Sequence, residues 1–249
     1  MMKLTDQQEL EKRNFHKNFG QSWYFDATYD LNATEHLSQC QDQWPRDDKY
    51  SWRIPNIYYY LDHIMRDNPE TIYDIGCANQ LMKKIFKDKV NIVGIDPYGD
   101  QADQKLDFNE FAKLNKHTIS HAFAINSIHY TCITRFKARL LQFFSIFKKG
   151  GLGFVTLNIE KLIANTNDAV QIRLFGSKID QHNWKLAYDY VQNELAQLMN
   201  DYSKEIFDSN AGVMVLRPLE FILVEMLPEY YSNHMDGNVR IIFRVNDLI

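Results

Sequence analysis

The stretch YDIGCANQ, residues 73–80, decides how the rest of the chain is interpreted. Its apolar start, followed by an Asp, a Gly and polar residues, is typical of a buried strand that opens into a ligand-binding turn. Gly76 is its one glycine, where such turns usually have two or three. Ala78 keeps the backbone close to a ligand if its φ is negative, whereas a positive φ at Gln80 would cost about 1–2 kcal/mol. Asn79 tolerates the left-handed conformation, so we expect the turn to be made there.

Composition limits the possible functions. The chain has 249 residues, 45% of them hydrophobic and 24% charged, enough to bury the core of one domain. A formal charge of -4 gives no overall basic field for a nucleic acid. The three cysteines are far apart and form no ligand pattern with histidines, so we expect neither disulfides nor a metal site. The polar amino terminus, and the lack of a run of about 20 apolar residues, predict a soluble, cytoplasmic protein without a membrane segment.

The chain divides into an irregular start and a regular remainder. Residues 1–50 show no sustained period and are interpreted as an extension, either a lid or a strap packed over the core. A helical pattern follows in residues 51–69 and begins the main domain, 51–249.

From residue 71 onward, apolar runs alternate with amphipathic segments. The sequence predicts strands at 71–76, 90–96, 104–108, 119–127, 151–159, 220–227 and 238–245. It predicts helices at 80–88, 109–116, 134–148 and 183–206. The first five strands are joined mostly through helices and predict a parallel sheet, whereas the short link 228–237 predicts an antiparallel pair at the end. We therefore expect an α/β fold: a doubly wound, mostly parallel seven-stranded sheet with a C-terminal antiparallel hairpin and helices on both faces. Its ligand site should lie at the carboxyl ends of the strands.

Four short motifs, in this order, resemble those of class I S-adenosylmethionine-dependent methyltransferases over residues 50–249. DIGCA (74–78) resembles the first motif, and GIDPY (94–98) the second, whose acidic residue holds the ribose hydroxyls. LDF (106–108) resembles the third, where an Asp and the next amide address adenine. FSIFKKGGLGFVTL (144–157) resembles the approach to the fifth strand, with Lys149 in place of Pro.

The resemblance implies that the cofactor is S-adenosylmethionine and the product S-adenosylhomocysteine. The residues that it places at the cofactor are Asp74, Gly76, Cys77, Ala78, Gln80, Asp96, Pro97, Asp107, Phe108 and, through its carbonyl, Asn126.

Physical reasons support Asp96 and leave Asp107 open. Asp96 follows Asp74 by 22 positions, close to the interval of about 20 at which an acidic residue meets a ribose in a βαβ unit. Its alternative role is to cap the turn at Pro97. For Asp107, cofactor binding and capping of the helix that begins near Asn109 are both open.

A nicotinamide cofactor is the competing interpretation of such a sheet. In the G-x-G-x-x-G pattern started at Gly76, Leu81 takes the third glycine position and would crowd the packing of helix against strand. Asp74 would repel a pyrophosphate, whereas it suits a cofactor that carries an ammonium and a sulfonium. The sequence favours S-adenosylmethionine.

The acceptor site is expected at NSIHYT, residues 126–131, just past a strand end. His129 is the candidate base, because its pKa lies near operating pH; the alternative is a histidine enclosed in the loop. Tyr130 is the second candidate catalytic residue and either shapes the acceptor pocket or packs.

The sequence thus predicts an enzyme that transfers a methyl group to a small molecule, with a protein side chain as a variant acceptor. A non-catalytic methyltransferase-like partner subunit or scaffold is the alternative. An RNA or DNA acceptor is disfavoured, because AINSIHY (124–130) lacks the prolines of the N-P-P-Y signature and no basic tract is present. The oligomeric state stays open.

Overall fold

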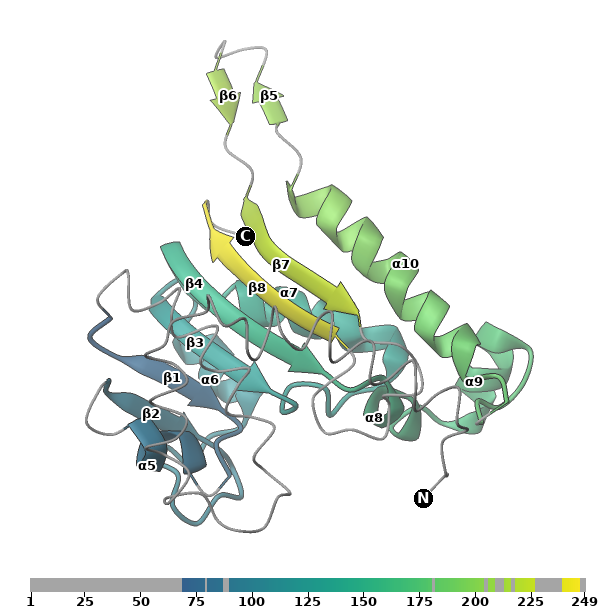
Figure 1. The fold of residues 1–249 in the computed structure, drawn as a ribbon, viewed down its shortest axis with the longest axis horizontal. Helices are drawn as coiled ribbons and strands as arrows, with labels where there is room; N and C mark the ends of the chain where they lie inside the picture. Colours follow the sequence, from purple (N-terminus) through teal and green to yellow (C-terminus); the bar gives the residue numbers. More distant parts are fainter. Residues whose placement is uncertain are drawn as a thin grey trace, which may run out of the picture.

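The computed structural model describes residues 69–78, 80–86, 90–180, 182–203, 206–208, 213–215, 218–226 and 239–246 (Figure 1). The extension at residues 1–50, the helix expected in 51–68, the expected left-handed Asn79 and the link 228–237 lie outside the described residues. The domain boundary at residue 50 therefore stays a prediction.

A six-stranded mixed sheet forms the centre of the fold (Figure 1). Its strands are β1 (Ile72–Ile75), β2 (Ile92–Ile95), β3 (Ile119–Ile125), β4 (Phe147–Leu157), β7 (Leu219–Met226) and β8 (Val239–Val245). They lie in the order β2-β1-β3-β4-β8-β7; β1 to β4 are parallel, and β8 is antiparallel to both of its neighbours. The predicted mixed α/β sheet is confirmed. The described residues form six of the seven predicted strands, and the hairpin link itself stays a prediction.

The strand expected at 104–108 is reduced to one residue. Gln104 forms a single parallel bridge to Ile95, at the edge of the sheet beyond β2. Helix α6 (Phe108–Leu114) then begins at once, because the Asp107 carboxylate accepts the Glu110 amide at 3.0 Å and caps the helix. The prediction of a strand through Phe108 is therefore wrong.

The helix expected at 134–148 ends earlier than its apolar spacing indicates. A 3-10 turn η3 (Ile133–Arg135) leads into α7 (Phe136–Phe144), and Phe147 already begins β4. The carbonyl of Ile146 accepts the amides of Thr118 and Ile119 at 3.0 and 2.9 Å. These bonds to the start of β3 draw the chain into the sheet and stop the helix.

Helices α5 (Leu81–Phe86) and α10 (Trp184–Ser203) lie where the sequence predicts helices. Two further helices were not predicted, α8 (Ile159–Ala164) and α9 (Asp168–Phe175). Asn158 and Asn167 cap them by accepting amides three residues on, which also ends the predicted strand 151–159 at Leu157. A separate antiparallel pair, β5 (Ile206–Asp208) and β6 (Val213–Val215), follows α10 and was not predicted either (Figure 1).

Aromatic rings from α7 and the sheet form the centre of the core. The ring of Phe243 on β8 meets Phe144, Phe147 and Phe143 edge to face, with centroids 4.4, 5.1 and 5.8 Å apart. Gly153 on β4 leaves the room for this ring, because a β-carbon there would lie 2.3 Å from Phe243 Cζ. Edge-to-face contacts add to the free energy of burial, so Phe243 joins β8 to the helix layer.

Truncation of Phe243 should be costly. We expect Phe243→Ala to lower the free energy of unfolding by about 3–5 kcal/mol, because it removes a fully buried ring from a close-packed site. Leu186→Ala is the control, since Leu186 is 43% exposed on α10, and it should change stability by about 0.5 kcal/mol or less. Urea denaturation measures both. Equal losses for the two variants would contradict this account of the core.

Three described residues in the turn after β1 have a left-handed backbone conformation, with positive φ. Gly76, Ala78 and Gln80 have φ of 79°, 48° and 56°. The condition of a negative φ at Ala78 is therefore not met, and the strain anticipated at Gln80 is present there and at Ala78, at about 1–2 kcal/mol each. Gly76 is obligatory for a second reason, because a β-carbon would lie 2.1 Å from the Cβ of Ser127 at the end of β3.

Replacement of Ala78 by glycine tests this strain. We expect Ala78→Gly to raise the free energy of unfolding by about 1 kcal/mol, because glycine adopts positive φ without a steric penalty. Ala102→Gly is the matched control, since Ala102 lies in the following loop and is not left-handed; it should lower stability by up to about 1 kcal/mol through the entropy of the unfolded chain. Thermal or urea unfolding gives both values. A loss of stability in both variants would contradict the strain.

Candidate functional site

A cleft of about 900 Å³ lies at the carboxyl ends of β1, β2 and β3, where the sequence places the ligand site. Of the residues predicted for the site, those that line it are Gly76, Ala78, Asp96, Pro97, Asp107, Phe108, Asn126 and Tyr130. Asp74, Cys77, Gln80 and His129 are buried residues outside this lining. Predicted residues from all the early strands thus meet at one edge of the sheet.

The Asp96 carboxylate joins the two turns that border the cleft. Its Oδ2 accepts the Ala78 amide at 3.0 Å, from the turn after β1. Its Oδ1 accepts the amides of Tyr98 and Gly99, both at 2.8 Å, from the turn after β2. The capping role foreseen as an alternative is therefore present. A carboxylate oxygen can accept about two hydrogen bonds, so Oδ2 retains the capacity to accept a hydroxyl hydrogen from a ligand.

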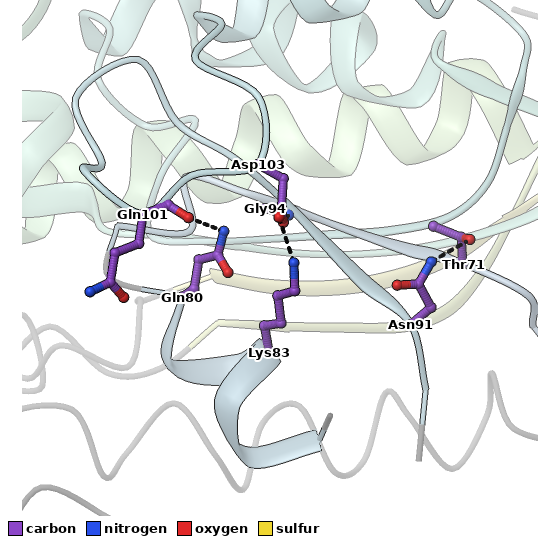
Figure 2. A network of polar contacts seen from close by, with 7 residues as sticks. All are labelled: Thr71, Gln80, Lys83, Asn91, Gly94, Gln101 and Asp103. Atoms are coloured by element: carbon purple, nitrogen blue, oxygen red, sulfur yellow. Dashed lines mark hydrogen bonds and ion pairs between the residues drawn. The ribbon is translucent and has the colours of Figure 1, made fainter. Parts of the chain in front are cut away.

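A set of polar contacts behind the cleft holds the loop after β2 against α5 (Figure 2). Gln80 Nε2 donates to the carbonyl of Gln101, and Lys83 forms an ion pair with Asp103. Asp103 also accepts the Gly94 amide at 2.8 Å. Burial by itself would raise the pKa of Asp103, but the bonds from Lys83 and Gly94 outweigh burial and hold this pKa below its usual value. Gln80 therefore lies outside the cleft lining and holds Gln101, which is part of that lining.

Asp74 and Cys77 form the buried base of the first turn. Burial, followed by the negative charges of Asp74, Asp96 and Asp103, raises the pKa of the Cys77 thiol to about 12. The thiol stays protonated at neutral pH and cannot act as a nucleophile. Asp74 lies on β1, where it pairs with Gly94 and Phe123, and it is buried outside the cleft lining.

A guanidinium that sequence reasoning missed lies at the α6 side of the cleft. Arg139 on α7 donates to Asn109 Oδ1 at 2.7 Å and to Gln142 Oε1 at 3.0 Å, and its guanidinium carbon lies 5.4 Å from the centre of the Phe108 ring. Burial lowers the pKa of Arg139, and the nearby Asp107 charge opposes that shift. The guanidinium stays charged. Its hydrogen bond to Asn109 holds the start of α6, which Asp107 caps, against α7.

Asn126 adopts a left-handed conformation, with φ of 47°, where β3 leaves the sheet. Its amide donates to Thr156 Oγ1 at 2.9 Å, and the Thr156 hydroxyl lies 3.1 Å from Asn126 Oδ1. The buried Thr156 on β4 thus holds the segment that enters the predicted acceptor loop. Sequence reasoning did not find Thr156, because it lies in an apolar strand 30 positions away.

The two predicted catalytic residues have different environments. His129 is 2% exposed and lies outside the cleft lining, whereas Tyr130 is 69% exposed and borders the cleft. Their ring centroids are 4.7 Å apart. Tyr98 also borders the cleft and is 91% exposed, a position that the sequence analysis did not single out. Two exposed tyrosines therefore frame the opening.

Negative charge predominates in the cleft. Among its described lining residues, Asp96, Asp100 and Asp107 face the single cation Arg139. Within the described ranges, no group of three or more His, Cys, Asp or Glu could hold a metal ion. Because carboxylates outnumber cations in its described lining, the cleft suits an organic ligand that carries positive charge.

None of the described helices combines the length and apolar character that a membrane crossing requires.

No protein-family model matches the chain, and neither does any curated protein. Solved methyltransferase structures resemble it distantly. SAH-bound PaMTH1 from Podospora anserina is 15% identical with a TM-score of 0.44, over 99% of this chain and 100% of that one. A SAM-dependent methyltransferase from Archaeoglobus fulgidus is 12% identical with a TM-score of 0.40, over 76% and 92%. The 1,6-didemethyltoxoflavin-N1-methyltransferase of Burkholderia thailandensis is 10% identical with a TM-score of 0.43, over 89% and 88%.

At such identities and TM-scores, these likenesses carry no information about activity. The sheet itself, parallel from β1 to β4 with antiparallel β8 between β4 and β7, agrees with the mostly parallel sheet that the sequence predicts.

Proposed function

We propose that the chain is an S-adenosylmethionine-dependent methyltransferase that acts on a small molecule. The observation that carries the proposal is the Asp96 carboxylate, which is fixed at the border of an acidic cleft by amides from both flanking turns. A carboxylate so held can accept a ribose hydroxyl without first becoming ordered, which lowers the entropic cost of binding.

The residues present fit such a cofactor. The cleft volume of about 900 Å³ lies within the range of small-molecule sites. Asp96 and Asp107 complement a ligand with a sulfonium and an ammonium, and Leu106 and Phe108 give an apolar wall for adenine. Gly76 and Ala78 bring the backbone of the first turn to the cleft lining, where the methionine part of the cofactor would bind.

When bound, the cofactor supplies an electrophilic methyl group. The protein has only to align the acceptor with it and to exclude water. We propose that Tyr130 borders the acceptor. His129, whose ring centroid is 4.7 Å from that of Tyr130, positions the tyrosine ring or receives a proton from an acceptor that holds one tightly. A small molecule is the favoured acceptor, because the opening is framed by tyrosines and its lining is acidic; a protein side chain is the variant.

A non-catalytic methyltransferase-like partner subunit is the second candidate. The observation that favours it is the loss of glycine at the left-handed positions 78 and 80, which leaves a strained turn and, at Ala78, a methyl group beside the cleft. Cofactor binding without turnover would separate this candidate from the first.

Calorimetry with S-adenosylmethionine tests the proposal. We expect the unmodified chain to bind, and Asp96→Asn to weaken binding by on the order of 10- to 100-fold, because a charged hydrogen bond contributes about 1.5–3 kcal/mol. Asp100→Asn is the matched control, since this exposed carboxylate borders the same cleft, and its affinity should change far less. Circular dichroism checks that both variants fold.

Absence of binding to the unmodified chain at millimolar concentrations would sink the proposal, and equal weakening in both variants would remove the role of Asp96. Transfer of a tritiated methyl group in a cell extract then identifies the acceptor. We expect label in the small-molecule fraction. Label in protein would select the variant acceptor, label in RNA would refute both, and no label despite binding would favour the partner subunit.

A further inference from the structure

A second hollow of about 920 Å³ lies at the opposite end of the sheet from the cleft. Its lining comes from the amino-terminal ends of β1 and β3, from the start of β4 and from Arg244 on β8. The cleft, by contrast, is lined by residues at the carboxyl ends of the parallel strands. No described residue lines both hollows, so this groove belongs to a different site.

The charge of the groove is opposite to that of the cleft. Among the described residues, Lys148, Lys149 and Arg244 line it, together with one acidic residue, Glu70. Because the chain as a whole carries -4, this group of cations is a local reversal of sign. Such a reversal at a concave surface attracts anions.

An irregularity of β4 creates this group of cations. Ile119 on β3 pairs with Phe147, but His121 pairs with Leu152, so four residues of β4, 148–151, lie opposite the single residue Ser120. The extra residues leave the ladder as a bulge that includes left-handed Gly150, with φ of 82°. Both lysines are exposed on this bulge, and neither forms an ion pair within the described part of the chain.

Arg244 is fixed beside the lysines. Its Nη1 donates to the carbonyl of Gly150 at 3.0 Å, which brings the guanidinium from β8 to the bulge of β4. The hydrogen bond from Arg244 to the backbone of the bulge thus holds cations from two strands close together. A ligand that binds them loses less free energy to the ordering of side chains.

The rest of the groove lining includes hydroxyl groups and apolar side chains. Thr71 Oγ1 accepts a hydrogen bond from the side-chain Nδ2 of Asn91 at 3.0 Å, so the hydroxyl hydrogen of Thr71 is directed elsewhere (Figure 2). Tyr73 packs against Phe111 with ring centroids 5.5 Å apart, and Leu114 is 72% exposed. A ligand here would meet cations, hydroxyl groups and apolar side chains.

We propose that this groove binds a phosphate-bearing small molecule, with the phosphate at Lys148, Lys149 and Arg244 and an apolar body against Tyr73 and Leu114. Lysine and arginine are the usual phosphate-binding side chains, and a volume of this size suits a small ligand. A nucleic acid is disfavoured, because its affinity depends on many phosphate contacts along an extended basic surface, whereas these cations occupy one bulge. The inference is independent of the proposed function.

Calorimetry on the full chain with phenyl phosphate and with inorganic phosphate tests the groove. Phenyl phosphate supplies both the phosphate and an apolar body, and it carries no adenosine that could enter the cleft. We expect it to bind several-fold more tightly than inorganic phosphate. Lys148→Gln/Lys149→Gln should weaken this binding by on the order of tenfold or more, because it removes two charged hydrogen-bond donors.

Lys84→Gln/Lys161→Gln is the matched control, since it removes the same charge from two exposed lysines outside the groove, and its affinity should equal that of the unmodified chain. No binding of either phosphate at millimolar concentrations, or an equal loss in both double variants, would overturn the proposal. A short RNA that binds the unmodified chain but not the Lys148/Lys149 variant, while phenyl phosphate does not bind, would overturn it in favour of a nucleic acid.

Discussion

The cleft depends on one carboxylate that satisfies three backbone amides. Asp96 accepts hydrogen bonds from Ala78, Tyr98 and Gly99, so the turns after β1 and β2 both close on its two oxygens. Bonds from amides to an ionised acceptor are stronger than neutral ones. This explains how Ala78 can stay left-handed without glycine, because the conformation that costs about 1–2 kcal/mol is the one that presents its amide to Asp96.

The same arrangement concentrates negative charge around the buried Cys77 thiol. Asp74, Asp96 and Asp103 all act on the Cys77 thiol, and Lys83 neutralises only the outermost of the three. A site with this potential is poorly suited to phosphates and well suited to a cation, while the basic groove has the opposite preference. One sheet thus separates two chemically different hollows, one at each end of its parallel strands.

The pattern of apolar and polar residues predicts the strand positions and the residues that follow them. Apolar runs locate β1, β2 and β3, and the ends of β2 and β3 locate Asp96 and Asn126 at the cleft. The errors arise where distant atoms decide. Phe147 continues a helical spacing, but the amides of Thr118 and Ile119 draw the chain into β4. Likewise, the φ of Ala78 follows from a carboxylate 18 positions away, and Arg139 is held in the cleft by Asn109, 30 positions away.

The place of β8 in the sheet has a consequence for biosynthesis. β8 follows β7 in the chain but lies between β4 and β7, with six register pairs to β4. Strands β1 to β4 can therefore associate while the ribosome is still translating, whereas β7 has no neighbour in the sheet until β8 has emerged. In that interval β4 presents an unpaired, apolar edge, which is a template for wrong strand pairing. The nascent chain is thus most exposed to aggregation just before residues 239–245 leave the exit tunnel.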